Sequence, residues 1–475
     1  MKKYDAVVVG SGPNGLSAAI RLAQAKLSVL LLEAHGTVGG GMRSAELTLP
    51  GFTHDVCSAV HPLGVASPFF RSLPLEKYGL KWIDPSVPLV HPFMEGPCVT
   101  LERSLEATSH SLNQDGPIYQ HLMQPFVLHA DHLLADILAP LHFPKHPLLM
   151  ARFAYYGIRS AEGLARSLFK SREARGLFAG LAAHSIMPLD KSITAGFGLM
   201  LGVLGHAVGW PIPLGGSQSL ANALAAYFVS LGGEILTHTK IEHMSEIPPA
   251  DAILFDLTPK QLLTIVDDFP LSYRKRLEKY RYGPGVFKID WALSQPIPWK
   301  AKECAKAGTV HLGGTLEEIA ASEKLVFNGK IPSTNFILLA QPTLFDPSRA
   351  PPGQHIAWAY CHVPHGSSED LTIQIERQIE QYAPGFRDCI LSRKTSSAIE
   401  LEKYNPNYVG GDINGGMQDI YQLFTRPVAR IVPYSTPLKG VYICSSSTPP
   451  GGGVHGMCGF YAAEAALTHL MQGHH

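Results

Sequence analysis

Three glycines near the amino terminus have the spacing that binds a pyrophosphate. Residues 10–15 read Gly-Ser-Gly-Pro-Asn-Gly, after an apolar run and before a stretch of helical periodicity. Gly10 permits a tight turn, Gly12 lets the main chain approach the phosphates, and Gly15 lets the helix lie close to the strand. Glu33 ends the next apolar run and can accept a ribose hydroxyl. The spacing predicts a dinucleotide site at a helix amino terminus, which serves NAD and FAD alike.

A second glycine-rich turn follows the second apolar run. Residues 39–43 read Gly-Gly-Gly-Met-Arg. A turn of this kind can present main-chain N–H groups to a phosphate, and Arg43 can supply positive charge. The alternative interpretation is a surface turn with a solvated arginine.

A third turn lies near the other end of the chain. Residues 445–456 read Ser-Ser-Ser-Thr-Pro-Pro-Gly-Gly-Gly-Val-His-Gly, between an apolar run at 441–444 and a helical stretch that ends at about residue 471. A strand, a proline–glycine turn and a helix start form a pocket of free N–H groups that favours anions.

The elements that position these turns alternate between strand and helix. Apolar runs predict strands at 4–9, 28–32, 234–244 and 251–256. Helical spacing predicts a helix at 16–25 and a second helix that opens within 213–220 and runs to 231. Residues 193–210 are largely apolar and uncharged. Their five glycines and the prolines behind them favour a buried helix leading into a strand over a membrane span.

The composition argues against a nucleic-acid-binding protein and against a disulfide-rich or zinc-binding one. The 475 residues carry 39 basic and 39 acidic side chains, so no charge excess points to nucleic acid. The seven cysteines form no C-x-x-C pair, which favours a reducing compartment over a disulfide framework or a zinc site. The first residues lack the apolar stretch of a signal peptide. We therefore expect a cytoplasmic protein.

Taken together, the turns resemble a known superfamily. The Gly-Gly-x-x-Arg run at residues 39–43 and the Thr-Pro-Pro-Gly-Gly-Gly-Val-His-Gly run at 448–456 are similar to motifs of FAD-containing amine oxidases and carotenoid desaturases. Further blocks at residues 61–63, 209–211, 282–285 and 410–412 resemble the phytoene desaturase-like branch. Within it, the chain is most similar to the group called pyridine nucleotide-disulfide oxidoreductase domain-containing protein 2.

The resemblance implies FAD as cofactor and assigns it a set of residues. One departure from the family is Ser445-Ser446-Ser447, where the family often has Gly-x-Gly, although a serine hydroxyl can still reach a ribityl or phosphate oxygen. The residues expected at FAD are Gly10, Gly12, Pro13, Asn14, Gly15, Glu33, Ala34, Gly40, Gly41, Met42, Arg43, Ile241, Ser446, Gly453, Val454 and His455.

The same resemblance implies a two-part α/β fold. The first part is a Rossmann-like FAD-binding domain of the glutathione-reductase-like, two-dinucleotide-binding type, assembled from residues 1–85, 205–265 and 405–475. The second is a substrate domain with a mixed sheet and a helical cap, built from residues 86–204 and 266–404. The strand expected over 282–293 alternates two faces, one of them aromatic, and such a face is a natural roof for an apolar substrate. A sheet packed on helices would show the same pattern.

His61 and His455 are the candidates for catalysis, because histidine titrates near neutral pH. His61 follows the first FAD segment, and His455 lies in the turn that the resemblance places over the flavin. A hydrogen-bonded structural role is the alternative for each. Lys288 is the one candidate for the lysine that amine oxidases of the superfamily place near flavin N5. His129 and His132 flank Asp131, but without further ligands we expect an exposed helix face and no metal.

We therefore expect an FAD-dependent, phytoene-dehydrogenase-like oxidoreductase that passes hydride between an apolar substrate carbon and flavin N5. A flavin amine oxidase and an FAD-bound regulatory or scaffold protein are the alternatives. A hydrophobic small molecule is the expected partner. The basic and apolar region 120–190 suits a helical cap over an apolar channel, a face that contacts a membrane, or ordinary helix packing with solvated arginines. Peripheral membrane contact and a homo-oligomer stay open.

Overall fold

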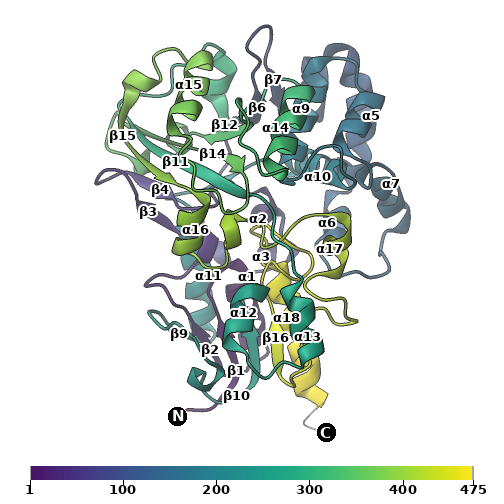
Figure 1. Ribbon diagram of the computed structural model, residues 1–475, viewed down its shortest axis with the longest axis vertical. Helices are drawn as coiled ribbons and strands as arrows, with labels where there is room; N and C mark the ends of the chain where they lie inside the picture. The colour runs from purple at the N-terminus through teal and green to yellow at the C-terminus, as the bar shows by residue number, and fades with distance from the viewer. Residues whose placement is uncertain (1, 473–475) are drawn as a thin grey trace.

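The computed structural model describes residues 2–472, so Met1 and residues 473–475, among them His474 and His475, lie outside the described residues. The chain forms two halves, each built on one large sheet (Figure 1). The lower half in this view holds the first strand and the last helix.

The lower half contains a five-stranded sheet in which all neighbours are parallel. Its order is β16-β10-β1-β2-β9. The strands are β1 (Tyr4–Val9), β2 (Val29–Leu32), β9 (Glu234–Leu236), β10 (Ala250–Phe255) and β16 (Val441–Ile443). Because parallel strands end at the same edge, the turns after β1, β2, β10 and β16 meet there.

Helices cover both faces of this sheet. One face packs on α1 (Pro13–Gln24), α11 (Gln218–Ser230) and α18 (Met457–Gln472), and the other on α12 (Pro259–Ile265) and α13 (Leu271–Glu278). Along β1, Val8 points into the first layer and Val7 into the second. Burial on both faces explains why these strands appear in the sequence as unbroken apolar runs.

The strand predicted over 234–244 is shorter than expected. It ends at Leu236, because the following residues turn back toward the end of β2, where the Thr239 amide donates a hydrogen bond to the Glu33 carbonyl at 2.8 Å. The other strands of the sheet lie within a residue or two of their predicted bounds.

The upper half contains a seven-stranded mixed sheet of order β15-β11-β14-β13-β12-β6-β7. Its strands are β6 (Val87–His91), β7 (Val99–Leu101), β11 (Gly285–Leu293), β12 (Ala307–Leu312), β13 (Ile337–Ala340), β14 (His355–Val363) and β15 (Ile390–Ser396). One face packs on α5 (Gly116–Leu128), α9 (Arg172–Ala183), α10 (Thr194–Ala207) and α14 (Leu316–Phe327), and the other on α15 (Thr372–Tyr382). The predicted α/β fold class, with a Rossmann-like sheet and a mixed sheet with helices, is confirmed; the domain limits given above stay a prediction.

The aromatic face of β11 does not form the expected roof. Phe287 and Trp291 are buried on the α15 side, where the Trp291 indole N–H donates to Glu376 at 3.0 Å. The opposite face of β11 carries Lys288 and Asp290, which pair in register with Tyr360 and Trp358 of β14.

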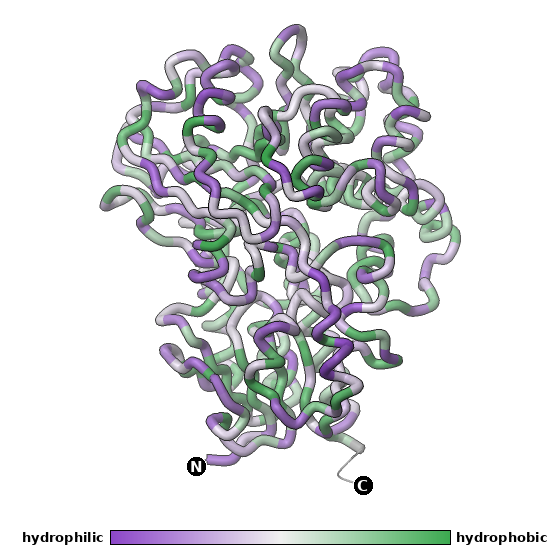
Figure 2. Tube along the Cα trace, in the orientation of Figure 1, coloured by the Kyte–Doolittle hydropathy of each residue, from purple (hydrophilic) through white to green (hydrophobic). Residues whose placement is uncertain are grey.

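The apolar stretch at 193–210 forms α10, followed by the short strand β8 (Ile212–Pro213). Hydrophobic and hydrophilic residues are interspersed along the trace of both halves (Figure 2). Among residues 2–472, no helix combines the length and the apolar composition needed to cross a bilayer.

Candidate cofactor and substrate site

One cavity of about 1060 Å³ runs from the first sheet to the second. It begins at the glycine turn after β1, passes residues 57–63, and ends against Trp358 and Tyr360 on β14. Its volume is at the upper end of what cofactor and substrate sites occupy in proteins. The cavity therefore offers one continuous space to a dinucleotide and a second molecule.

The two glycine turns lie directly against each other. A Cβ on Gly15 would fall 2.0 Å from the Gly10 carbonyl oxygen, and a Cβ on Gly40 would fall 2.9 Å from the Gly12 Cα. No side chain fits between the turns, so their main-chain N–H groups stay accessible at the start of α1.

Glu33 is held in place at the end of β2. Its carboxylate accepts hydrogen bonds from the amide and hydroxyl of Ser11, from the His35 amide at 2.7 Å, and from the Arg43 guanidinium at 2.9 Å. The Glu33 and Arg43 side chains are 8% and 6% exposed. Arg43 is therefore not a solvated surface arginine; it orients the carboxylate that faces the cavity.

Asp256, which sequence reasoning did not select, lies under the same turn. Its carboxylate accepts a hydrogen bond from the Gly15 amide at 2.9 Å and would be 2.6 Å from a Cβ on Gly12. Burial, and secondarily the charge of Glu33, raise the pKa of Asp256 to about 7. An acid directly after β10, at the same sheet edge as Glu33, was the available sequence signal.

The three serines at 445–447 have different roles: two of the hydroxyls donate to main-chain carbonyls, and the third lines the cavity. Ser445 donates to the Leu257 carbonyl and Ser447 to the Gly415 carbonyl, each at 2.8 Å. Ser446 accepts from the Asn14 amide nitrogen at 3.2 Å and lines the cavity. The buried Asn14 Oδ1 beside it has no partner among residues 2–472. This set of donors and acceptors fits the hydroxyls of a ribityl chain.

His61 lines the cavity as a neutral histidine. The Ser217 hydroxyl donates to the Ser58 carbonyl at 2.6 Å, so the 2.8 Å contact between Ser217 Oγ and His61 Nε2 leaves the histidine as the donor. Burial lowers the pKa of His61 to about 4. Its Nδ1 therefore carries a free lone pair at neutral pH.

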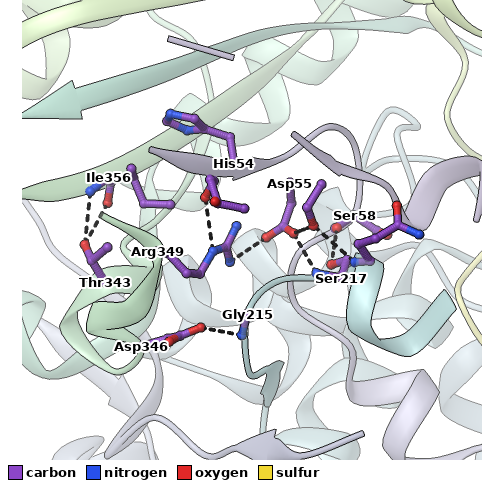
Figure 3. A network of polar contacts seen from close by, with 12 residues as sticks. His54, Asp55, Ser58, Gly215, Ser217, Thr343, Asp346, Arg349 and Ile356 are labelled. Carbon is purple, nitrogen blue, oxygen red and sulfur yellow. Dashed lines mark hydrogen bonds and ion pairs between the residues drawn. The ribbon is translucent and has the colours of Figure 1, made fainter. Parts of the chain in front are cut away.

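Ser217 belongs to a buried network that joins the two halves (Figure 3). The Asp55 carboxylate accepts from the Ser217 amide at 2.7 Å and lies 2.8 Å from Arg349 Nη1. Arg349 and Asp346 come from the loop between β13 and β14, and Asp346 accepts from the Gly215 amide at 2.7 Å. Burial raises the pKa of Asp55, but Arg349 and the hydrogen bonds outweigh it and hold the pKa below its ordinary value.

His455 has a structural contact. Its Nδ1 accepts a hydrogen bond from the Met457 amide at 3.0 Å at the start of α18, and its carbonyl accepts from the Ser67 hydroxyl. Burial lowers its pKa to about 4, and it is not among the residues that line the cavity. Its part in proton transfer stays a prediction.

Most of the residues predicted to bind FAD line the cavity. These are Gly10, Gly12, Pro13, Asn14, Glu33, Ala34, Gly40, Gly41, Arg43, Ile241, Ser446, Gly453 and Val454. Gly15 lies below the turn, and Met42 is fully buried in the core between β1 and its helices. The residues missed by sequence reasoning include the segment 403–408, which ends one helix and follows it, and the upper end of the cavity.

Lys288 is buried and neutralised. Its ammonium donates to both carboxylate oxygens of Asp290, one of them at 2.5 Å, and lies 5.7 Å from the centre of the Trp358 ring. Trp358 and Tyr360 are stacked on one strand with ring centres 5.8 Å apart. They form a single wall and not a pair that encloses an amine from two sides.

His129 and His132 stack with ring centres 5.8 Å apart on the helical cap. Within residues 2–472, no group of three or more histidine, cysteine or acidic side chains is arranged to hold a metal ion.

The buried histidines predict a loss of stability in acid. Burial lowers the pKa of four of them to about 4, from 6.5: His61, His91, His206 and His455. Between these values the unfolded chain binds protons that the folded chain does not. The contribution of these neutral histidines to the free energy of unfolding is then fully present above pH 6.5. It is lost as the pH drops toward 4.

At pH 5.5 the loss is about 1.4 kcal/mol per histidine. Urea unfolding at pH 7.5 and 5.5 measures it. His206 lies outside the cavity, bonded to Tyr119 and to the Glu102 carbonyl. We expect His206→Gln to reduce the pH dependence; equal unfolding midpoints at both pH values in the unaltered protein would contradict the prediction.

Comparison with known proteins agrees with this geometry. Residues 8–73 match the NAD(P)-binding Rossmann-like domain family. The chain is 27% identical to the mouse pyridine nucleotide-disulfide oxidoreductase domain-containing protein 2, over 98% of this chain and 94% of that one. It is 24% identical to a lycopene-forming phytoene desaturase of Pseudescherichia vulneris, over 98% and 99%. An oxidoreductase from Methanosarcina mazei has the same fold, with a TM-score of 0.67, 16% identity and coverage of 98% and 100%. The predicted resemblance to the phytoene desaturase-like proteins is confirmed.

Proposed function

We propose that this chain, an FAD-dependent oxidoreductase similar to phytoene desaturases, passes hydride between a carbon of an apolar substrate and flavin N5. The observation that carries the proposal is the continuous cavity. One end has the glycine turns, Glu33 and Arg43, and the other has the apolar and aromatic side chains of Leu338, Trp358 and Tyr360. A cofactor at the first end would meet a substrate at the second.

Each group of residues at the first end would bind the part of FAD that its chemistry suits. The start of α1 and the turn at residues 39–41 suit the diphosphate, Glu33 suits a ribose hydroxyl, and Asn14 with Ser446 suits the ribityl chain. When bound, FAD supplies the two-electron chemistry, with N5 as the atom that exchanges hydride.

The chain's own contribution is to position the substrate and exclude water. In the oxidising direction the substrate loses a hydride from one carbon and a proton from its neighbour, and gains a double bond. Neutral His61, which lines the cavity and has a free lone pair on its buried Nδ1, is the group we propose to accept the proton. The apolar and aromatic side chains of the upper end keep water from the reacting carbon.

We also propose a cytoplasmic location with contact to a membrane surface. Support comes from the helical cap, where Leu141, Phe143 and Leu148 are 80–87% exposed. In the sequence, Lys145 lies between these residues and Arg152 follows them. Apolar side chains mixed with basic ones suit a surface of anionic lipids. All seven cysteines are free thiols, which fits a reducing compartment.

The first experiment is an absorption spectrum of the purified protein, followed by anaerobic titration with polyenes, cyclic terpenoids, amines and NAD(P)H. We expect flavin bands near ~375 and ~450 nm, which belong to the cofactor and are tuned by the protein. Bleaching by an apolar compound supports the proposal. Bleaching only by amines would favour the amine oxidase alternative, and a flavin that none of them reduces would favour the scaffold alternative.

A further inference from the structure

The upper end of the cavity contains polar groups that the proposed function does not use. They lie on the face of the second sheet that is turned toward α9 and α10. The register places Thr309 of β12 in one row with Ala340 and Trp358, and His311 in the next row with Leu338 and Tyr360. His184, the residue after α9, meets this face from the helical side.

His184 and His311 form a hydrogen-bonded pair whose direction can be worked out. Their Nε2 atoms are 3.1 Å apart, so one of them donates. The buried His311 Nδ1 has no partner among residues 2–472. A proton on that atom would be an unsatisfied buried donor, which is costlier than an unused lone pair. The proton of His311 is therefore on Nε2 and is donated to His184.

This assignment fixes the tautomer of His184. The Nε2 atom of His184 accepts the hydrogen bond from His311, so the proton of neutral His184 is on Nδ1. Since His184 lines the cavity, this Nδ1–H is the group that can donate to a bound molecule. Burial, and secondarily His362, lower the pKa of His184 to about 3. At neutral pH the residue is an uncharged hydrogen-bond donor.

Two further groups point to a ligand at the same place. Thr309 and Trp358 line the cavity, are 5% and 6% exposed, and have polar atoms, Oγ1 and Nε1, without a partner among the described residues. Leaving two buried polar groups unpaired is costly. A side-chain rotation that turns either group toward the cavity would let it pair with an oxygen atom of a bound molecule.

Within the described residues, the upper end of the cavity offers no unpaired charge to a charged group of a ligand. Lys288, whose ammonium lies against the Trp358 ring, is paired with Asp290, so the two charges cancel. The cavity end is otherwise formed by uncharged side chains: His184, Leu201, Trp210, Thr309, Leu338 and Tyr360. A carboxylate or an ammonium ion would lose its hydration there without gaining a counter-charge.

We propose that the substrate is an apolar molecule with one uncharged oxygen function, a hydroxyl or a carbonyl, that His184 donates a hydrogen bond to this oxygen, and that Thr309 or Trp358 is its second partner. This inference rests on the proposed function and narrows its substrate class. His311 is a positioning residue, because it acts only by holding His184 in the donor tautomer. A pure hydrocarbon would leave the same polar groups unpaired, so it should bind more weakly.

Matched probes test the proposal on the FAD-loaded protein. Limonene, carvone and carvylamine share one carbon skeleton. Limonene is a hydrocarbon, carvone carries a carbonyl group, and carvylamine carries an amine. Geranylgeraniol and its parent hydrocarbon repeat the comparison on a longer skeleton. Binding is measured by calorimetry and by the perturbation of the flavin absorption bands. We expect the oxygenated member of each pair to bind about tenfold more tightly than the hydrocarbon, and the amine to bind no better than the hydrocarbon.

Variants assign the preference to the named groups. His184→Leu and Thr309→Val should each reduce the preference for carvone over limonene, whereas His184→Asn, which keeps an N–H near Nδ1, should retain most of it. Thr309→Val removes an unpaired hydroxyl and should leave the melting temperature unchanged or higher. Ser185→Ala is the matched control: its hydroxyl is also buried and unpaired, but Ser185 does not line the cavity.

Equal binding of the oxygenated and hydrocarbon probes, binding of neither, or a preference that survives in His184→Leu and Thr309→Val would overturn this inference while leaving the flavin function standing. A protein that takes up no FAD would overturn the proposed function itself.

Discussion

Replacing Arg349 with methionine is expected to destabilise the protein by about 3–5 kcal/mol. The Arg349 and Asp55 side chains are both 0% exposed, and their charged atoms lie 2.8 Å apart. Without the guanidinium, the Asp55 carboxylate would be a buried charge without a counter-charge, and the Thr53 carbonyl would lose the donor that now lies 3.1 Å away. Urea unfolding monitored by tryptophan fluorescence measures the loss.

An exposed ion pair supplies the control. Arg71 and Asp131 also form a pair, but their side chains are 51% and 68% exposed. Arg71→Met should therefore cost less than about 1 kcal/mol. If Arg349→Met cost no more than Arg71→Met, the buried network would not be holding the two halves together as described.

Replacing Gly15 with alanine is expected to weaken FAD binding by about 10- to 100-fold. The new Cβ would lie 2.0 Å from the Gly10 carbonyl oxygen and 3.0 Å from the Asp256 carboxylate. The first contact is with main chain, so the turn itself has to move. Overpacking of this kind costs about 1–3 kcal/mol, and here the displaced atoms are those that we propose to hold the diphosphate. Equilibrium titration of the apoprotein with FAD measures the change.

Gly283→Ala serves as the matched substitution. A Cβ there meets Asp412 at 3.5 Å, an ordinary contact, so FAD binding should stay within about twofold of the unaltered protein. Unchanged FAD binding by Gly15→Ala would show that the glycine turn does not position the cofactor.

The parts of the site that could be predicted are those whose chemistry is local in the sequence. The turn after β1, Glu33 and the turn at 39–43 each depend on residues close together in the chain, and glycine spacing reports directly on main-chain geometry. The parallel sheet of the first half followed from the same motifs, because a glycine turn between strand and helix implies such a sheet. The mixed sheet of the second half was implied only by the resemblance to the family.

The parts that could not be predicted depend on segments that only the fold brings together. His184 and His311 are 127 residues apart and meet because α9 packs on the second sheet. Asp256 becomes notable only when β10 lies beside β1 and its carboxylate is buried under the first turn. Periodicity placed Lys288 and Asp290 on one face of β11 but did not show that they neutralise each other.

The bond between Asn14 and Ser446 has a consequence for the protein's synthesis. These residues are 432 positions apart, yet both line the cofactor end of the cavity. At translation rates of roughly 5–20 residues per second, about 20–90 s pass between the emergence of one and the other. During that interval β10 lacks its neighbour β16, and the α1 face lacks α18. The nascent chain therefore exposes the apolar surface that α18 later covers, and it needs protection from aggregation until the last part of the cofactor pocket has left the ribosome.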